Sequence, residues 1–342
     1  MFDRPVSRSI VTLIVGTTGA AALSLIGFPA APLVGAALAT TALAWGGMRL
    51  SLPNRLRDAG FLVIGVSLGS GFRSELLGQI GGWGLSLVVL CLSIYATVVT
   101  SRFVLMRWYG QDRETALLAS APGTLSLALS MAVSGRGDAT AVLVLQCMRL
   151  LILSAVLPLG MVLLGVEAGS AGAAANRLEP LPLIGVLAVG ALVSWFIAHR
   201  GFPAAYLLGG MLVSALSHVS GLVHGTPPAW LLFAGFCVTG SVMGVRFTGV
   251  KLADILRFLK ASATSVGAAA LISMGFAAVV AAVTGLPFGQ VWVAYAPGGV
   301  EAMAAIGLAL DFDGAYVALH HLCRIAFLMA LIPWMARKQT RF

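Results

Sequence analysis

Two arginines lie in the middle of long apolar runs, and each follows a Pro-Gly pair at the same spacing. Arg149 stands as far beyond Pro122 as Arg324 stands beyond Pro297. An arginine at the centre of a bilayer-spanning helix costs about 2.5 to 3.5 kcal/mol on insertion scales. Because both lie far from the ends of their runs, we expect them to pair inside the protein; the alternative is that they snorkel to the surface.

Polar side chains accompany both arginines at helical spacing. Gln146 stands three residues before Arg149, and His321 stands three residues before Arg324. Residues three or four apart share a helical face, so His320 lies on the face of Arg324 as well. Each run therefore carries a polar stripe.

Glu301 is the one acidic residue of twelve that lies within an apolar segment, and it closely follows Pro297-Gly298-Gly299. The corresponding residue after Pro122-Gly123 is Ser126. Only the second segment therefore has a titratable side chain at this position, which indicates a site that accepts a proton on one side. A structural ion pair with a membrane arginine is the alternative role for Glu301.

Each Pro-Gly pair interrupts an apolar segment. Proline lacks a backbone donor and disfavours helix at the residue before it, so nearby carbonyls and amides lose their helical partners. In lipid, such a break is tolerated only where the backbone is buried or lines a cavity. Paired breaks are typical of transporter binding sites, where the N-termini of half-helices face an anion. Two packing kinks are the alternative.

The composition is that of a membrane protein. Charged residues make up 10% and hydrophobic residues 59% of the chain, whereas soluble domains carry about 25% charged residues. Apolar runs of spanning length without period-two alternation predict an all-α, multi-pass protein in lipid. The formal charge of +9 is spread over short loops, so no nucleic-acid partner is expected. The cysteines are dispersed, and we expect neither a metal site nor a cofactor.

The chain contains an internal repeat that keeps one nearly constant offset along its whole length. Gly27-Phe28-Pro29 returns as Gly201-Phe202-Pro203, and Gly65-x-x-x-Gly69 returns as Gly240-x-x-x-Gly244. The spaced glycines predict close packing of helices. We expect a first membrane repeat over residues 9–166, a linker over 167–181 and a second membrane repeat over 182–337.

Positive charge predicts that the two repeats are inverted, because cytoplasmic loops collect Lys and Arg. In the first repeat, Arg55 and Arg57 lie in the loop after the second span. In the second repeat, the charged loop with Arg246 and Lys251 comes one membrane span later. Each repeat reads as about five to six helical segments, and inversion needs an odd number of crossings. We therefore expect two inverted repeats, each with a broken or re-entrant helix at its Pro-Gly pair.

Inversion would bring both breaks and both polar stripes together near the middle of the membrane. Two arginines against one glutamate favour a small anion, and the arginine fork matches a carboxylate. Glu301 or His321 would couple transport to protons, and Na⁺ bound by freed carbonyls is the other coupling ion. The predicted substrate-binding residues are Pro122, Gly123, Ser126, Gln146, Arg149, Pro297, Gly298, Gly299, Glu301, His320, His321 and Arg324.

Two motifs carry a resemblance to a known family: Ala-Pro-Gly-Gly-Val-Glu-Ala-Met over 296–303 and His-His-Leu-Cys-Arg over 320–324. Together with the duplication, they resemble the AbrB family of bacterial membrane proteins, which is distinct from the DNA-binding regulators of that name. The family looks related to cation:proton antiporters and anion transporters with inverted repeats. The resemblance therefore implies a transporter in the bacterial inner membrane.

Members of this family also carry the labels ammonia monooxygenase and regulator of gene expression. Copper or iron needs clustered ligands, and His320-His321 is the only histidine cluster, with side chains about 100° apart on a helix. We therefore expect no enzyme of this kind. A regulatory effect would be indirect, through a transported signal or a protein partner. A non-transporting scaffold and a homo-oligomer both stay open.

Overall fold

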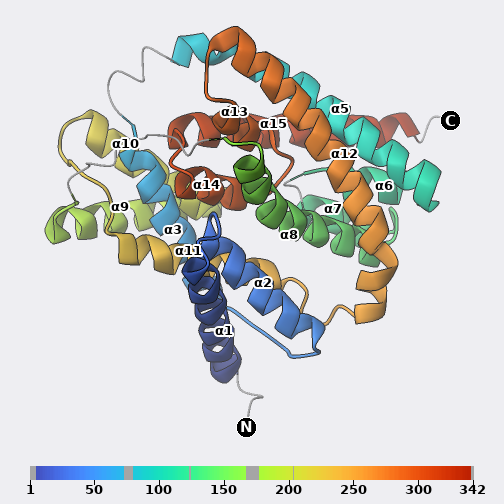
Figure 1. Cartoon of the computed structure of the whole chain (residues 1–342), viewed down its shortest axis with the longest axis horizontal. Helices are drawn as coiled ribbons and strands as arrows, with labels where there is room; N and C mark the ends of the chain where they lie inside the picture. The colour runs from blue at the N-terminus through green and yellow to red at the C-terminus, as the bar shows by residue number, and fades with distance from the viewer. Residues whose placement is uncertain (1–4, 73–79, 123–124, 167–176, 203, 340–342) are drawn as a thin grey trace.

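The computed structural model describes residues 5–72, 80–122, 125–166, 177–202 and 204–339. Within these ranges the secondary structure is helical apart from one isolated bridge. The first repeat contains α1 (Pro5–Leu25), α2 (Ala31–Trp45), α3 (Asn54–Ser70), the 3₁₀ turn η1 (Ile80–Trp83), α5 (Gly84–Tyr109), α6 (Arg113–Ser120), α7 (Leu125–Val133) and α8 (Ala139–Leu163). The second contains α9 (Pro180–His199), α10 (Ala205–Val219), α11 (Ala229–Val245), α12 (Leu252–Thr284), α13 (Phe288–Tyr295), α14 (Val300–Ala309) and α15 (Gly314–Gln339) (Figure 1).

Several helices have the length and composition of membrane spans. Among the described residues, six helices are long and apolar enough to cross a bilayer, namely α1, α5, α8, α9, α12 and α15. A helix rises about 1.5 Å per residue, so about 20 residues cross the hydrocarbon core. The apolar helices α2, α10 and α11 are shorter. The prediction of an all-α polytopic membrane protein is confirmed.

Two residues around the Gly-Phe-Pro turn have the same backbone conformation in both repeats. Gly27 and Gly201 have φ of 69° and 75°, in the left-handed region that glycine adopts without strain. Ala30 and Ala204, which cap α2 and α10, both have φ of 53°, which alanine rarely adopts. A rare conformation at two equivalent alanines means that the sequence duplication is also a structural one.

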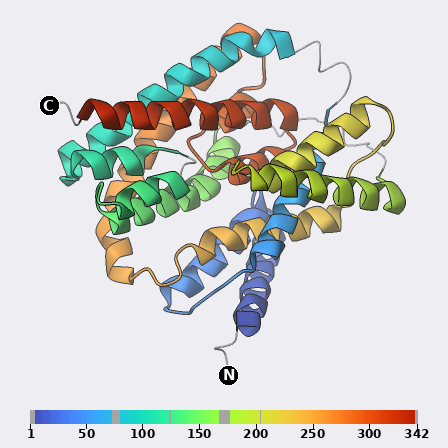
Figure 2. The same cartoon turned by 180° about the vertical axis from the view of Figure 1, so that it is seen from behind.

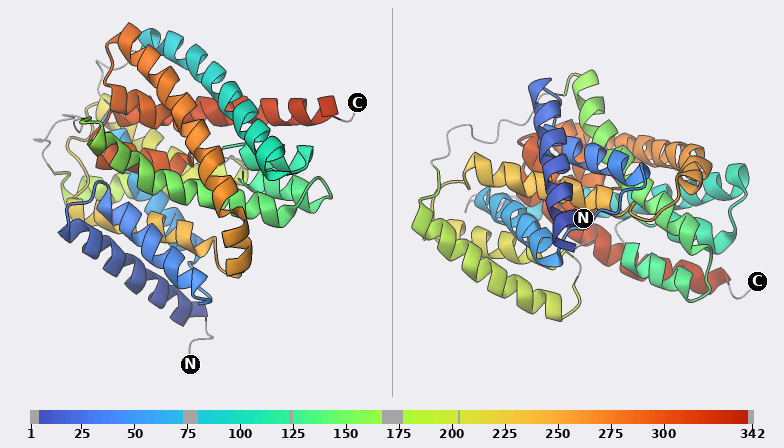
Figure 3. Two further views of the ribbon diagram at one scale, coloured as in Figure 1. Left: turned by 45° about the vertical axis from the view of Figure 1, so that its right-hand side comes forward. Right: turned by 90° about the horizontal axis from the view of Figure 1, so that it is seen from below.

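The helices divide into two bundles, which we call the glycine bundle and the broken-helix bundle. The glycine bundle consists of α1 to α3 and α9 to α11, and the broken-helix bundle of α5 to α8 and α12 to α15. In the broken-helix bundle, α15 lies beside α5 (Figure 2), and α5 lies beside α12 (Figure 3). Each repeat therefore supplies helices to both bundles.

Spaced glycines join the two repeats in the glycine bundle. A Cβ atom at Gly65 of α3 would collide with the carbonyl oxygen of Leu207 in α10, and one at Gly240 of α11 would collide with that of Leu33 in α2. Leu33 and Leu207 are equivalent positions of the repeat. The glycine helix of each repeat therefore packs on the same leucine of the other repeat. Close packing at these glycines is confirmed. Such reciprocal contacts are those of two copies related by a two-fold axis.

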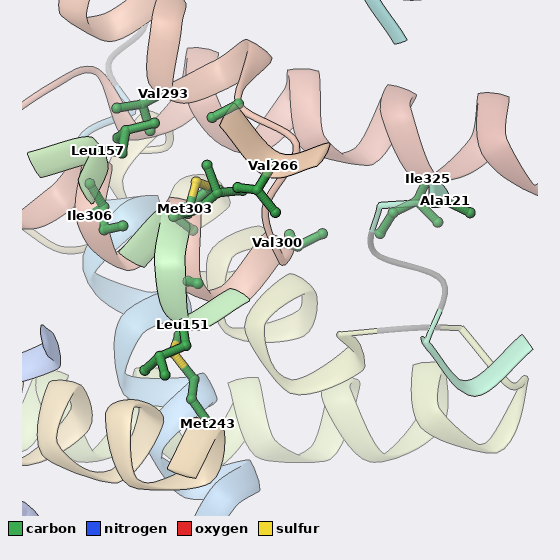
Figure 4. Packing of buried hydrophobic residues seen from close by; sticks show 14 of the residues in the cluster. Ala121, Leu151, Leu157, Met243, Val266, Val293, Val300, Met303, Ile306 and Ile325 are labelled. Carbon is green, nitrogen blue, oxygen red and sulfur yellow. The ribbon is translucent and has the colours of Figure 1, made fainter. Parts of the chain in front are cut away.

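The broken-helix bundle contains the two interrupted helices. The chain forms separate half-helices on either side of each Pro-Gly pair: α6 and α7 in the first repeat, α13 and α14 in the second. Buried packing fixes their positions: Met303 and Ile306 of α14 have no exposed surface and belong to the same core as Leu157, Val266 and Val293 of α8, α12 and α13 (Figure 4). The predicted helix break in each repeat is confirmed.

Candidate functional site

The half-helices α6 and α13 both end at an extended residue that precedes proline. Ala121 has ψ of 109° and Ala296 has ψ of 134°, as proline imposes on the residue before it. Because each helix stops there, its last carbonyls have no helical donor and form the negative end of the helix dipole. These carbonyls need donors from elsewhere in the protein.

Arg324 of α15 supplies such donors in the second repeat. Its side chain is fully buried; Nη1 donates to the carbonyl of Ala296 at 2.5 Å, and Nη2 donates to that of Gly298 at 2.6 Å. The guanidinium presents its N–H groups in a fixed fork that suits two neighbouring oxygens. Arg324 therefore holds the break around Pro297.

Arg149 of α8 holds the break in the first repeat in a similar way. Nη1 donates to the carbonyl of Ala119 at 3.2 Å, and Nη2 donates to that of Ala121 at 3.2 Å and to Gln146 Oε1 at 3.3 Å. Ala121 and Ala296 are equivalent positions of the repeat. Both arginines therefore pair inside the protein, as predicted, and most of their partners are backbone carbonyls rather than acidic side chains.

Gln146 and His321 occupy equivalent positions beside the arginines. Gln146 Nε2 donates to the carbonyl of Leu118 at 2.7 Å. His321 lies near the backbone of Val293, which is the counterpart of Leu118 in the second repeat. Both side chains are fully buried. Gln146 thereby fastens α8 to α6, whereas neither ring nitrogen of His321 has a hydrogen-bond partner among the described residues.

His320 belongs to a different polar cluster, on the side of α15 that faces the start of α5. Its Nδ1 donates to the carbonyl of Tyr316 at 2.8 Å, so in the neutral ring Nε2 accepts from Ser86 Oγ, 2.8 Å away. Ser86 also contacts the hydroxyls of Tyr316, at 2.5 Å, and of Tyr295. His320 therefore joins α5, α13 and α15 and makes no contact with the two arginines.

A cavity of about 540 Å³ lies between the two bundles and reaches both breaks. We call it the central cavity. Its lining residues are Leu125, Gln146, Arg149, Leu150, Gly299, Val300, Glu301, Ile325 and Met329 from the broken-helix bundle, and Arg57, Asp58, Phe61, Ala198, Gly201, Phe202, Ala204, Ala205, Tyr206 and Arg246 from the glycine bundle. Glu301 is half-buried and has no hydrogen bond or ion pair within the described ranges. Its carboxylate is therefore available to a ligand or a proton.

The two breaks meet at a second, smaller cavity of about 20 Å³. Ala119, Ser120 and Arg149 of the first repeat line it together with Pro297 of the second, and α5 and α12 add serine and threonine side chains. Arg324 lies close enough to interact electrostatically with both Arg149 and Glu301. The structure thus brings the two breaks together, as the inverted arrangement predicts.

The predicted site residues fall into three groups. Gln146, Arg149, Gly299 and Glu301 line the central cavity. Arg324, Pro122, Pro297 and Gly298 form or hold the breaks, while His320 and His321 lie behind them against α5 and α13. Gly123 lies outside the described residues, as does the side chain of Ser126.

Four polar residues of the central cavity are absent from the predicted set: Arg57, Asp58, Tyr206 and Arg246. In the sequence, Arg57 and Arg246 serve as signals of loop orientation, because both lie at helix ends. Their approach to the breaks depends on how the two bundles pack, which no local pattern encodes. Tyr206 follows the second Gly-Phe-Pro turn, and that turn is the signal that could have found it.

The fold and the site define a class: a duplicated all-α membrane protein with a broken helix in each repeat and a cavity between two bundles. Within the ranges that the structure describes, no group of three or more His, Cys, Asp or Glu residues could hold a metal ion. The chain belongs to the AbrB family, whose model, described as "Transition state regulatory protein AbrB", matches residues 32–339.

Two curated relatives are similar over nearly their whole length. "Uncharacterized protein YhjN" of Bacillus subtilis (strain 168) is 26% identical over 364 aligned positions, which cover 97% of this chain and 93% of that protein. "Putative regulator AbrB" of Escherichia coli (strain K12) is 23% identical over 315 aligned positions, which cover 90% of each chain.

Proposed function

We propose that this protein is a secondary transporter of a small organic anion in the bacterial inner membrane. The observation that carries the proposal is the central cavity, which lies between two bundles and reaches both broken helices. Leu125 and Val300, the first residues of α7 and α14, both line it. The positive ends of two half-helix dipoles therefore meet this space, which favours an anion.

The charges around the central cavity support the same sign of substrate. Arg149 lines it, and Arg324 lies close enough to Glu301 to interact with it electrostatically. Arg149 bonds to two carbonyls at the negative end of α6, and Arg324 bonds to that of Ala296 at the negative end of α13. With those ends compensated, the N-termini of α7 and α14 keep a positive potential toward a bound anion.

Glu301 supplies the coupling to protons. Its carboxylate competes with an anionic substrate for the positive potential of the site, and protonation removes that competition. A proton and an anion therefore favour each other's binding, and this coupling is reciprocal. We favour H⁺ over Na⁺ as the coupling ion because the carbonyls freed at the breaks accept hydrogen bonds from cationic arginines.

Part of the lining of the central cavity comes from helix ends that carry the predicted cytoplasmic loops. Arg57 lies at the start of α3, Ala198 at the end of α9 and Arg246 directly after α11. These ends are on the cytoplasmic side in the inverted topology that the loop charges predict. We therefore assign the conformation to an inward-facing state, with the cluster of Ser86, Tyr316 and His320 on the closed outer side.

Uptake into proteoliposomes tests this function. Purified full-length protein is reconstituted, and accumulation of labelled acetate, hexanoate, benzoate and succinate is measured with and without a pH gradient. We expect at least one carboxylate to accumulate above protein-free vesicles and the pH gradient to increase that accumulation. If none of these carboxylates, and no other organic anion in a wider panel, enters faster than into empty vesicles, the transporter proposal is wrong.

The name of the Escherichia coli relative raises a second function, regulation of gene expression. Six helices of the described part are long and apolar enough to span a membrane, and we expect such an effect to be indirect. Transport of a signalling metabolite would join the two functions, and loss of uptake in a variant would then abolish the effect on expression as well.

A further inference from the structure

The wall of the central cavity is largely apolar. Leu125, Leu150, Val300, Ile325 and Met329 line it on the side of the broken-helix bundle, and the glycine bundle adds aromatic and alanine side chains. Its volume of about 540 Å³ falls in the range of about 300 to 1,000 Å³ that is usual for sites of organic ligands. An inorganic anion would leave this apolar wall without a partner.

The cationic groups of the central cavity are not equally free. Arg57 donates from Nε and Nη2 to Oδ1 of its neighbour Asp58, at 3.0 and 2.8 Å. Arg149 donates to Ala119, Ala121 and Gln146. Neither guanidinium can offer its full fork to a ligand without losing these bonds.

Arg246 is the exception. It directly follows α11, is half-buried, lines the central cavity and has no hydrogen bond or ion pair to any residue that the structure describes. A cation at a helix C-terminus gains only about 0.3 to 1 kcal/mol from the helix dipole, which does not require that it face a cavity. The equivalent position of the first repeat is Gly71, so only the second repeat has an arginine at this position.

We propose that Arg246 binds the carboxylate of an organic anion whose apolar body lies against the broken-helix bundle. This assignment rests on the proposed transport function and names its substrate class: a monocarboxylate with an alkyl or aromatic body. Arg246 provides a planar pair of donors that matches a carboxylate. Glu301, on the opposite wall, faces the same space and releases its competition with the substrate when it is protonated.

Binding of matched ligands to purified full-length protein tests the role of Arg246. The ligands are hexanoate, its neutral analogue hexanamide, acetate and inorganic phosphate, and the proteins are the wild type, Arg246→Ala, Arg246→Lys and the control Arg257→Ala, which alters an exposed arginine of α12. We expect wild type to prefer hexanoate over hexanamide, and Arg246→Ala to lose about tenfold to a hundredfold of that preference, as for a charge-assisted hydrogen bond. Arg246→Lys should recover part of the preference, and Arg257→Ala should behave as wild type.

A merely structural role for Arg246 would lower the melting temperature or weaken both ligands equally, and would leave the ratio of hexanoate to hexanamide unchanged. An unchanged ratio in Arg246→Ala therefore overturns the assignment, while wild-type binding and uptake of hexanoate would still support the transport function. Phosphate that competes as well as hexanoate overturns the substrate class. If no carboxylate binds to or is transported by the wild type, the transport function itself fails.

Discussion

At the scale of single residues, the membrane-embedded arginines have a role different from the one that their charge first indicates. The sequence predicts that Arg149 and Arg324 are paired and near the breaks, because an unpaired guanidinium in lipid is costly. It does not predict their partners. The structure gives them carbonyls at the ends of α6 and α13, and only the folded backbone can reveal which carbonyls lack a helical donor. Arg246, in contrast, looks like an ordinary loop charge until the bundles are packed.

Replacing Arg324 with alanine should destabilise the fold. The carbonyl of Gly298 would lose its donor, while that of Ala296 would keep only the backbone N–H of Gly298. One unsatisfied buried group costs about 1 to 3 kcal/mol, and we expect a loss of this size. Thermal unfolding in detergent measures it, with Arg200→Ala as the control, because Arg200 is exposed and packs on Phe196. If Arg324→Ala melts at the wild-type temperature, the role of this arginine in holding the break is wrong.

At the scale of elements, the sequence predicts which helices break and which pack closely, and the structure confirms both. Proline chemistry localises the breaks, and the spacing of four between glycines localises the close contacts. The partner of each glycine helix is not encoded locally: α3 packs on α10 and α11 on α2 because two copies of one unit exchange equivalent surfaces. The cluster around Ser86 could likewise not be predicted from the sequence, because its members come from three separate helices, α5, α13 and α15.

Two glycine-to-alanine changes separate close packing from helix propensity. Gly240→Ala would drive a Cβ into the carbonyl of Leu33, and overpacking of this kind costs about 1 to 3 kcal/mol. The space around Gly267 of α12 is open, so a methyl group there meets no neighbour, and Gly267→Ala should be neutral or stabilise by up to about 1 kcal/mol. Melting temperatures of the two variants should move in opposite directions or differ by several degrees; equal shifts would contradict the reciprocal glycine contacts.

At the scale of the whole molecule, the duplication fixes the architecture. The all-α class, the repeat and the two breaks follow from composition, offset and proline positions, and the central cavity follows from the way in which two repeats share two bundles. A two-fold exchange of contacts is common to inverted and parallel repeats, and loop charge is what distinguishes them. The direction in which each helix crosses the bilayer stays a prediction from loop charge.

Reporter fusions check this topology. Fusions that end at Lys251 and at Gln290 lie on either side of α12, the longest described helix, and should report opposite sides, with Lys251 in the cytoplasm. A fusion at Arg57 serves as the matched control and should agree with Lys251. Identical signals at Lys251 and Gln290 would contradict inverted repeats and with them the inward-facing assignment.

The central claim is that an organic anion passes through the cavity between the bundles and that its passage is coupled to the protonation of Glu301. Glu301→Gln tests it most directly, with Glu179→Gln as the control, because Glu179 is exposed at the start of α9. Two measurements are made on the same proteoliposomes: accumulation of substrate driven by a pH gradient, and counterflow exchange at equal pH. We predict that Glu301→Gln keeps counterflow and loses accumulation, whereas Glu179→Gln keeps both. If Glu301→Gln accumulates substrate like the wild type, Glu301 is not the coupling group and the account is wrong.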